Sequence, residues 1–241
     1  MDNGAMRRGG AWLKQSLSGP AGRAFIALVL VALVGVIFNA EGAFYKIATH
    51  RDALRQASVY GILACGMTLV IIGGGIDLAV GSILALVAVS CATLAIHWNW
   101  SSWLTIPACL LIGGCCGGLS GFTAARLRVQ PFIATLAMMV FARGMAKYVS
   151  GGMKVSTAVQ NPDGTYRYVD VPPLFEAIDR RILGDTVPVV TLIFAICLAV
   201  AWAALAWHRW GREIYAIGGN EEAARLSGVP VVFAKLRSEE R

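Results

Sequence analysis

Long apolar blocks constrain the fold of this chain more than any other feature. Each block is close to the roughly 20 residues that a helix needs to cross a bilayer. The bilayer core offers no water to the backbone, so a spanning segment must satisfy its own N–H and C=O groups and is a helix rather than a strand. The sequence therefore predicts an all-α, polytopic transmembrane bundle of about six spans, in residues 24–40, 57–72, 79–96, 103–125, 132–149 and 187–207.

Composition supports an integral membrane protein. Hydrophobic residues make up 57% of the chain and charged residues 15%, which is too apolar for a soluble domain of this size. The first block follows four basic residues and has the length of a signal peptide. Five further blocks and the lack of a clear A-x-A cleavage site predict an uncleaved anchor instead. We therefore expect a multi-pass membrane protein, in contact with membrane lipid.

Basic residues predict the orientation of the spans. They gather in the N-terminal tail, after the fourth block and after the sixth, as Arg7, Arg8, Lys14, Arg23, Arg126, Arg128, Arg209, Arg212 and Arg225. With six spans these regions share one side, which the positive-inside rule assigns to the cytoplasm together with the N-terminus. Lys46, Arg51 and Arg55, in an expected outer loop, oppose this assignment. The net charge of +7 is thus a topology signal, and no nucleic acid partner is expected.

Residues 150–186 are expected to form an extracytoplasmic loop with some structure of its own. Two strand-like runs, 155–160 and 165–171, flank the turn sequence Asn161-Pro162-Asp163-Gly164, which favours a small hairpin. Two prolines end the hairpin, and residues 174–183 are expected as a short amphipathic helix at the membrane surface. A flexible loop is the alternative.

Motifs for covalent chemistry are missing from the sequence. There is no Walker A loop, no G-x-S-x-G elbow and no H-E-x-x-H helix, and the six cysteines lie inside apolar blocks without metal-ligand spacing. The three histidines sit at the ends of blocks, which favours an interfacial position. An aromatic belt is predicted for Trp98, Trp100, Trp103, Trp207 and Trp210. We expect no catalytic residue, no metal and no cofactor.

A glycine-rich stretch separates the second and third blocks without a polar loop. It reads GGGIDLAVGS over residues 73–82, and Asp77 is the one charged residue between Arg55 and Arg126. A carboxylate at the bilayer centre would cost roughly 2.5 to 3.5 kcal/mol, so Asp77 needs a partner, water or a helix N-terminus. The glycines permit a break in the helix, after which Asp77 can cap the next one. Either this structural role or a place on a solute path fits Gly74, Gly75, Asp77 and Ser82.

A short polar helix is predicted directly after the last block. Asn220 is a good N-cap, Glu221 and Glu222 place negative charge at the positive end of the helix dipole, and Gly228 stops the helix. A polar helix of about two turns has no core of its own and most plausibly persists by docking into something else. Its E-A-A-x-x-x-G pattern resembles the cytoplasmic coupling loop of ABC importer permeases. The alternative is an ordinary surface turn.

Four blocks together carry a wider family resemblance. They are GMTLVII with GGIDLAVGS (66–72 and 74–82), RLRVQPFIATL (126–136), RG (143–144) and YAIGGNEEAARLSG (215–228). In this order they resemble the ribose/xylose-type permeases of bacterial simple-sugar ABC importers, over residues 54–231. The resemblance raises the coupling-helix interpretation above that of a surface turn.

The resemblance implies partners and a mechanism. It implies a homo- or heterodimeric permease, a sugar-binding protein outside, and a separate cytoplasmic ATPase that hydrolyses ATP. The permease is then no enzyme, and its two subunits alternate between outward and inward openings. The ATPase contact would be made by Asn220, Glu221, Glu222, Ala223, Ala224, Arg225 and Gly228.

Two departures from the family pattern are expected to matter. Ser120 stands where the family often has Asn. Family members also continue past the coupling helix with further spans, whereas this chain ends in a polar tail, so we expect a truncated permease domain at 1–236, with the coupling loop at 209–230 and the tail at 237–241. The remaining alternatives are a secondary transporter, for which Asp77 is the sole clear intramembrane carboxylate, and a transport-inactive permease fragment.

Overall fold

The computed structural model describes residues 19–39, 41–127, 129–160, 163–170, 172–182, 184 and 186–231. The chain divides into two compact units, residues 1–54 and 55–241. In the first unit, helix α2 (Pro20–Ile37) starts with a proline, whose missing N–H costs nothing at the first helical position. It is followed by a 3₁₀ turn, η1 (Ala43–Tyr45), and the Phe44 ring of this turn packs against Gly35 of α2.

Long apolar helices dominate the fold, as predicted. Among the described residues, five helical stretches are long and apolar enough to cross a membrane, and the Gly22–Ile37 part of α2 is a shorter apolar stretch. The long ones are α3 (Ile47–Ile72), α4 (Val80–Ala92) with the π-helical turn η2 (Thr93–His97), α5 (Ser102–Arg126), α6 (Pro131–Val149) and α8 (Val189–Ala206). The prediction of an all-α transmembrane bundle is confirmed.

Helix α3 corrects one boundary. It begins at Ile47, well before residue 57, so Arg51 and Arg55 lie in a helix rather than in a loop. Arg55 forms an ion pair with Asp179 of the segment that follows α6. Both side chains are about half exposed, and such pairs contribute roughly 0 to 1 kcal/mol. Of the three cations that opposed the predicted orientation, Arg55 thus has an acidic partner in the same region.

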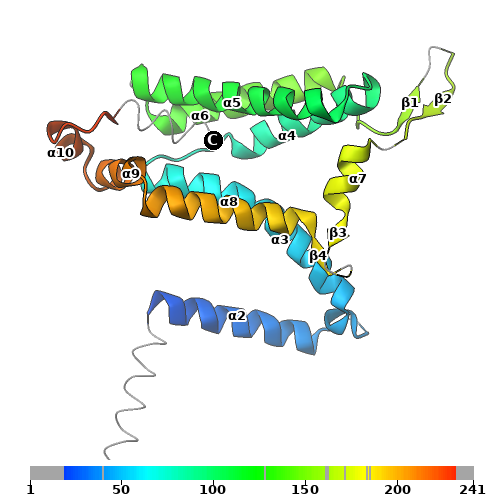
Figure 1. The fold of residues 1–241 in the computed structure, drawn as a ribbon, viewed down its shortest axis with the longest axis horizontal. Coiled ribbons are helices and arrows are strands. Elements are labelled where there is room, and N and C mark those ends of the chain that lie inside the picture. The colour runs from blue at the N-terminus through cyan, green and yellow to red at the C-terminus, as the bar shows by residue number, and fades with distance from the viewer. Residues whose placement is uncertain are drawn as a thin grey trace, which may run out of the picture. The chain divides into compact units, whose positions relative to one another are not determined.

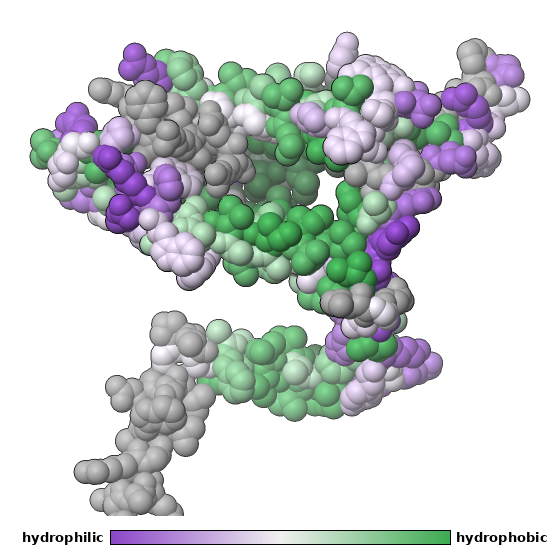
Figure 2. All heavy atoms as spheres, in the orientation of Figure 1, coloured by the Kyte–Doolittle hydropathy of each residue, from purple (hydrophilic) through white to green (hydrophobic). Residues whose placement is uncertain are grey.

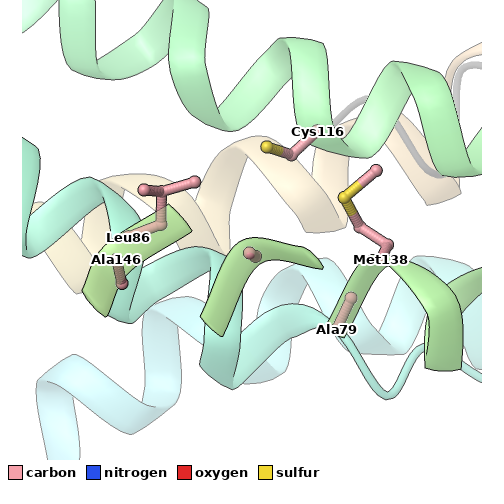
Figure 3. Packing of buried hydrophobic residues seen from close by; sticks show 6 residues of the cluster. Ala79, Leu86, Cys116, Met138 and Ala146 are labelled. Carbon is pink, nitrogen blue, oxygen red and sulfur yellow. The ribbon is translucent and has the colours of Figure 1, made fainter. Parts of the chain in front are cut away.

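Helices α4, α5 and α6 form one packed group in the second unit. Their shared core consists of Ala79, Leu86, Cys116, Met138, Ala142 and Ala146, and five of these residues are labelled in Figure 3. The alanines let the backbones of α4 and α6 approach closely, because membrane helices associate by packing rather than by hydrophobic exclusion. The thioether of Met138 and the thiol of Cys116 lie between the helices.

Residues 55–72 of α3 and helix α8 form another part of the second unit, where they run side by side (Figure 1). The buried Ser58 hydroxyl donates to Thr191 Oγ1 at 2.9 Å. The ring of Phe194 on α8 fills the space above Gly61 on α3, where an added Cβ would come within 2.5 Å of it. Only 6% of the apolar window of α8 is buried, so most of this helix faces outward from the fold.

The segment between α6 and α8 contains the predicted hairpin. Strands β1 (Ala158–Gln160) and β2 (Tyr166–Tyr168) pair antiparallel, with Ala158 opposite Tyr168. Asn161 and Pro162 of the predicted turn lie outside the described residues. Asp163 Oδ1 accepts hydrogen bonds from the N–H and the hydroxyl of Thr165, and these bonds lower the pKa of Asp163.

The helix predicted at 174–183 is shorter than expected. Helix α7 (Pro173–Asp179) ends early because Arg181–Ile182 form a strand, β3, that pairs with β4 (Val187–Pro188). Helices α9 and α10, after α8, lie at the end of the second unit opposite the hairpin and α7 (Figure 1). Figure 2 shows hydrophilic residues at these two ends and hydrophobic residues over the long helices between them.

Replacement of Gly61 tests the packing of α3 on α8. Gly61→Ala places a methyl group in the space of the Phe194 ring, and overpacking of this kind costs about 1 to 3 kcal/mol. We expect a lower thermal unfolding midpoint in detergent, partly restored by adding Phe194→Leu. Gly114→Ala on α5 is the matched control, because nothing lies within 4 Å of its Cβ position. Equal midpoints for the two alanine variants would contradict the packing.

Candidate functional site

Helix α9 (Arg209–Gly219) is amphipathic, and its apolar face packs in a cluster with Leu69 of α3. His208 is its N-cap, and Nδ1 accepts a hydrogen bond from the N–H of Trp210 at 3.2 Å. Trp210, Ile214 and Ile217 follow at helical spacing and are all buried. Trp210 is thus a core residue, and its predicted place in an aromatic belt is wrong. The other four tryptophans of the predicted belt are exposed.

Helix α10 (Glu221–Leu226) forms where the sequence predicts it. Asn220 caps it, with Oδ1 accepting from the N–H of Ala223 at 2.9 Å. Gly228 adopts a φ of +82°, which an L side chain rarely adopts. Its N–H donates to Arg225 O and the N–H of Val229 donates to Ala224 O, both at 3.0 Å, which is a Schellman motif. Both ends of this short helix are therefore satisfied locally.

The two faces of α10 differ in character. Ala224 is only 5% exposed and packs in one cluster with Leu69, Trp210, Ile214 and Ile217. The other side carries charge: Arg225 Nη2 lies 2.7 Å from Glu222 Oε1 on the surface, and this hydrogen bond raises the pKa of Arg225. The outward residues of α10 are Glu221, Glu222, Ala223, Arg225 and Leu226.

Sequence reasoning treated the two alanines as equivalent and did not include Leu226. Ala224 faces the chain's own core, so Ala223 is the alanine that remains available to a partner. Leu226 is 79% exposed and follows Ala223 by three positions, which places it on the same helix face. That spacing is the signal that would have found it. An open depression of about 260 Å³ lies between α9 and the residues that follow α10, lined by Arg209, Arg212, Glu213, Ala216, Ser227, Gly228 and Val229.

The glycine break between α3 and α4 forms as predicted. Gly74, at a φ of +78°, donates to Ile71 O at 3.0 Å, and Gly75 donates to Val70 O at 2.9 Å, which is a second Schellman motif. Asp77 Oδ1 accepts from the N–H of Ala79 at 2.7 Å. The N-cap of α4 is Ala79 itself, so Asp77 bonds to the helix start from two residues before the cap position rather than from the cap.

Two buried hydroxyls flank this break. Ser82 is buried in the first turn of α4. Thr135 on α6 is 1% exposed. Its single hydroxyl proton is shared among three carbonyl oxygens, Ile76 O at 3.2 Å from Oγ1, Pro131 O at 3.0 Å and Phe132 O at 3.3 Å. Thr135 was not predicted as a site residue. A local pattern does not reveal a bond between residues 59 positions apart.

The glycine break and the segment 209–230 meet in space. Leu69 of α3 belongs to the cluster of Trp210, Ile214, Ile217 and Ala224. Gly218 of α9 lies so close to Ile72 that a Cβ would overlap the Ile72 carbonyl oxygen. Two features that are separate in the sequence are therefore in contact at one end of the second unit.

Comparison with known protein sequences places the chain in a family. Residues 50–238 match the sequence profile of the permease component of branched-chain amino acid transport systems. The chain belongs to this family. Curated relatives of the chain are sugar import permeases, which confirms the resemblance predicted from the motif blocks. No solved structure matches the chain.

Three relatives show the extent of the similarity. The chain is 40% identical over 215 residues to the ribose import permease protein RbsC of Haemophilus influenzae, covering 89% of the chain and 62% of that protein. For the ribose import permease of Escherichia coli K12 the identity is 36%, covering 94% and 64%. For the fructose import permease protein FrcC of Rhizobium meliloti it is 31%, covering 89% and 58%. The chain thus spans about six tenths of the length of these curated relatives.

Removal of the Asn220 cap tests the local stability of α10. Asn220→Ala leaves the N–H of Ala223 without its acceptor, and loss of an N-cap costs about 1 kcal/mol. We expect faster amide hydrogen exchange over residues 221–226 in detergent. Asn220→Ser keeps a capping oxygen and should exchange like the parent chain. If the alanine variant exchanges no faster than the serine variant, the cap does not hold the helix.

Removal of the Thr135 hydroxyl tests the anchoring of the break. Thr135→Val keeps the shape but leaves Ile76 O without this donor, which we expect to lower the free energy of unfolding by about 0.5 to 1.5 kcal/mol. Thr123→Val is the control, because its exposed hydroxyl donates only to Leu119 O within α5 in the described bonds. An equal loss in the two variants would show that the bond to Ile76 adds nothing.

Proposed function

We propose that this chain is the membrane-spanning permease part of an ATP-binding-cassette importer that moves a simple sugar into a bacterial cell across the cytoplasmic membrane. The observation that carries the proposal is the geometry of α10. This helix follows the last long apolar helix, is capped at both ends, and is anchored by Ala224 while its charged side stays exposed. Such an exposed, rigid and charged helix is suited to docking in a groove of a partner protein.

A sugar is the favoured solute class. The family profile is described by branched-chain amino acid transport, but the relatives described above are named for ribose and fructose import. We therefore assign a pentose or hexose rather than an amino acid. The permease does no covalent chemistry on the sugar, and alternation between outward and inward openings is a two-state equilibrium that ATP-driven closure of the ATPase biases.

Three protein partners follow from the proposal. A cytoplasmic ATPase docks on α10 through Glu221, Glu222, Ala223 and Arg225, with Leu226 as an apolar contact and Asn220 and Gly228 shaping the ends of the helix. A second permease subunit, identical or related, completes the translocation path. A sugar-binding protein delivers the solute at the opposite end, where the hairpin and α7 lie (Figure 1).

The glycine break is proposed to border the path of the sugar. Gly74, Gly75 and Asp77 lie in a non-helical stretch between two membrane helices, and backbone of this kind is tolerated at membrane depth only where protein or a water-filled cavity surrounds it. Ser82 is buried in α4, so its place is in the wall behind the break rather than on an open surface.

Charge reversal at Glu222 tests the docking surface. The chain, and the same chain extended with the C-terminal part of a ribose import permease, would be co-purified with the ATPase of a ribose importer. We expect Glu222→Lys to weaken ATPase retention at least about tenfold, equivalent to about 1.4 kcal/mol, and to abolish sugar-stimulated ATP hydrolysis in the extended chain. Undiminished retention and stimulation would overturn the assignment of α10.

Two controls separate docking from helix stability. Glu176→Lys reverses an exposed charge on α7, at the opposite end, and should bind ATPase like the parent. The exchange Glu222→Arg with Arg225→Glu keeps an ion pair within α10 but inverts the charge pattern that a partner meets. If the exchange restores retention, the pair serves the helix alone. If uptake proceeds without any ATPase and follows a proton gradient, the chain is a secondary transporter instead.

A further inference from the structure

Helix α9 contacts the end of α3 and the break after it, and both partners contribute main-chain atoms to this contact. A Cβ at position 218 would overlap the carbonyl oxygen of Ile72 and lie 3.0 Å from its carbonyl carbon. From the other side, a Cβ at Gly74 would lie 3.8 Å from the Cα of Gly218. A contact between two main chains has no rotamer freedom with which to absorb a displacement, so a shift of α9 moves the end of α3 directly.

Helix α10 is joined to α9 without slack. Asn220 ends α9, donating its N–H to Ala216 O at 3.1 Å, and the same residue caps α10 through its side chain. Ala224 of α10 packs in the cluster that also holds Ile214 and Ile217 of α9 and Leu69 of α3. A packed core of this kind transmits strain rather than deforming.

The break is held from its other side by the α4–α6 group. Thr135 of α6 donates to Ile76 O at 3.2 Å, and Asp77 Oδ1 accepts from Ala79 N at 2.7 Å. Ala79 is fully buried in the core of α4, α5 and α6. The stretch 73–79 is therefore fixed to α9 at its beginning and to the helix group at its end.

We infer that residues 73–79 receive the movement of α10 and pass it to α4 and α6, and that Gly218 is the positioning residue for this transfer. The inference rests on the proposed function, in which an ATPase moves α10. It assigns to the glycine break a mechanical role in coupling, in addition to any place beside the sugar.

Two neighbouring glycines allow a sharp comparison. Alanine is ordinarily the better residue inside a helix, so neither Gly218 nor Gly219 is needed for the formation of α9. Nothing lies within 4 Å of a Cβ at Gly219, whereas a Cβ at Gly218 meets the backbone of α3. Gly218→Ala thus separates α9 from the break, and Gly219→Ala changes the same residue type one position away without that effect.

The test measures the accessibility of a residue within the break. Ile76 is 56% exposed, so Ile76→Cys gives a thiol that N-ethylmaleimide can reach, and mass spectrometry of the peptide distinguishes it from the native cysteines. The chain would be labelled alone, with the ATPase, and with the ATPase trapped by ATP and vanadate. We expect the labelling rate at position 76 to change at least about fivefold on trapping in the Ile76→Cys background and with Gly219→Ala added. With Gly218→Ala added, the ATPase should bind equally while the labelling rate stays constant.

The outcomes separate this inference from the proposed function. A full labelling change with Gly218→Ala overturns the inference and leaves ATPase docking intact. Failure of the ATPase to bind any version overturns the proposed function and the inference with it. If Gly218→Ala does not elute as a monodisperse species, Ile214→Leu replaces it, because this change conserves the volume but removes the Cγ2 methyl, which lies 3.6 Å from a Cβ built on Gly73. A reduced labelling change with retained binding then supports the inference, and a full change overturns it.

Discussion

The end of a helix leaves carbonyl groups that need hydrogen-bond donors, and this requirement organises the end of the molecule where the site lies. Helices α3 and α10 meet it with the same Schellman geometry, in which Gly74 and Gly228 hold the left-handed position. The motif on α3 allows a short non-helical connection to α4 instead of a polar loop. The motif on α10 turns the chain back so that Val229 and Val231 pack against the cluster around Ile214.

The same cluster determines which side of α10 is presented. Ala224 faces inward because it completes a core to which Leu69 and Trp210 also contribute, and the charged residues must then face outward. A short helix whose own propensity is insufficient is thereby held in one orientation by tertiary packing. The surface that we assign to the ATPase is consequently a product of the contact between α9 and α3, made by residues that lie beneath it.

Features that depend on local sequence could be predicted, and features that depend on contacts between distant segments could not. Hydropathy located the long helices, and cap and stop residues located α10, because both signals lie within the segment itself. The start of α3 was missed because Arg51, Asp52 and Arg55 lower the hydropathy without breaking the helix. Three features depend on elements that are far apart in the chain and so were missed. They are the burial of Trp210 against Leu69, the bond from Thr135 to Ile76, and the contact of Gly218 with Ile72.

The small buried fraction of α8 has a consequence for how the protein is made. A helix so apolar, with only 6% of its core window covered by its own chain, is stable in lipid by itself and can insert before it meets any neighbour. Helices α9 and α10 differ, because their apolar faces need the end of α3 as a support. During biogenesis the surface that we propose for docking can therefore form only after the end of α3 has met α8 and α9, which delays its appearance until this part of the bundle is in place.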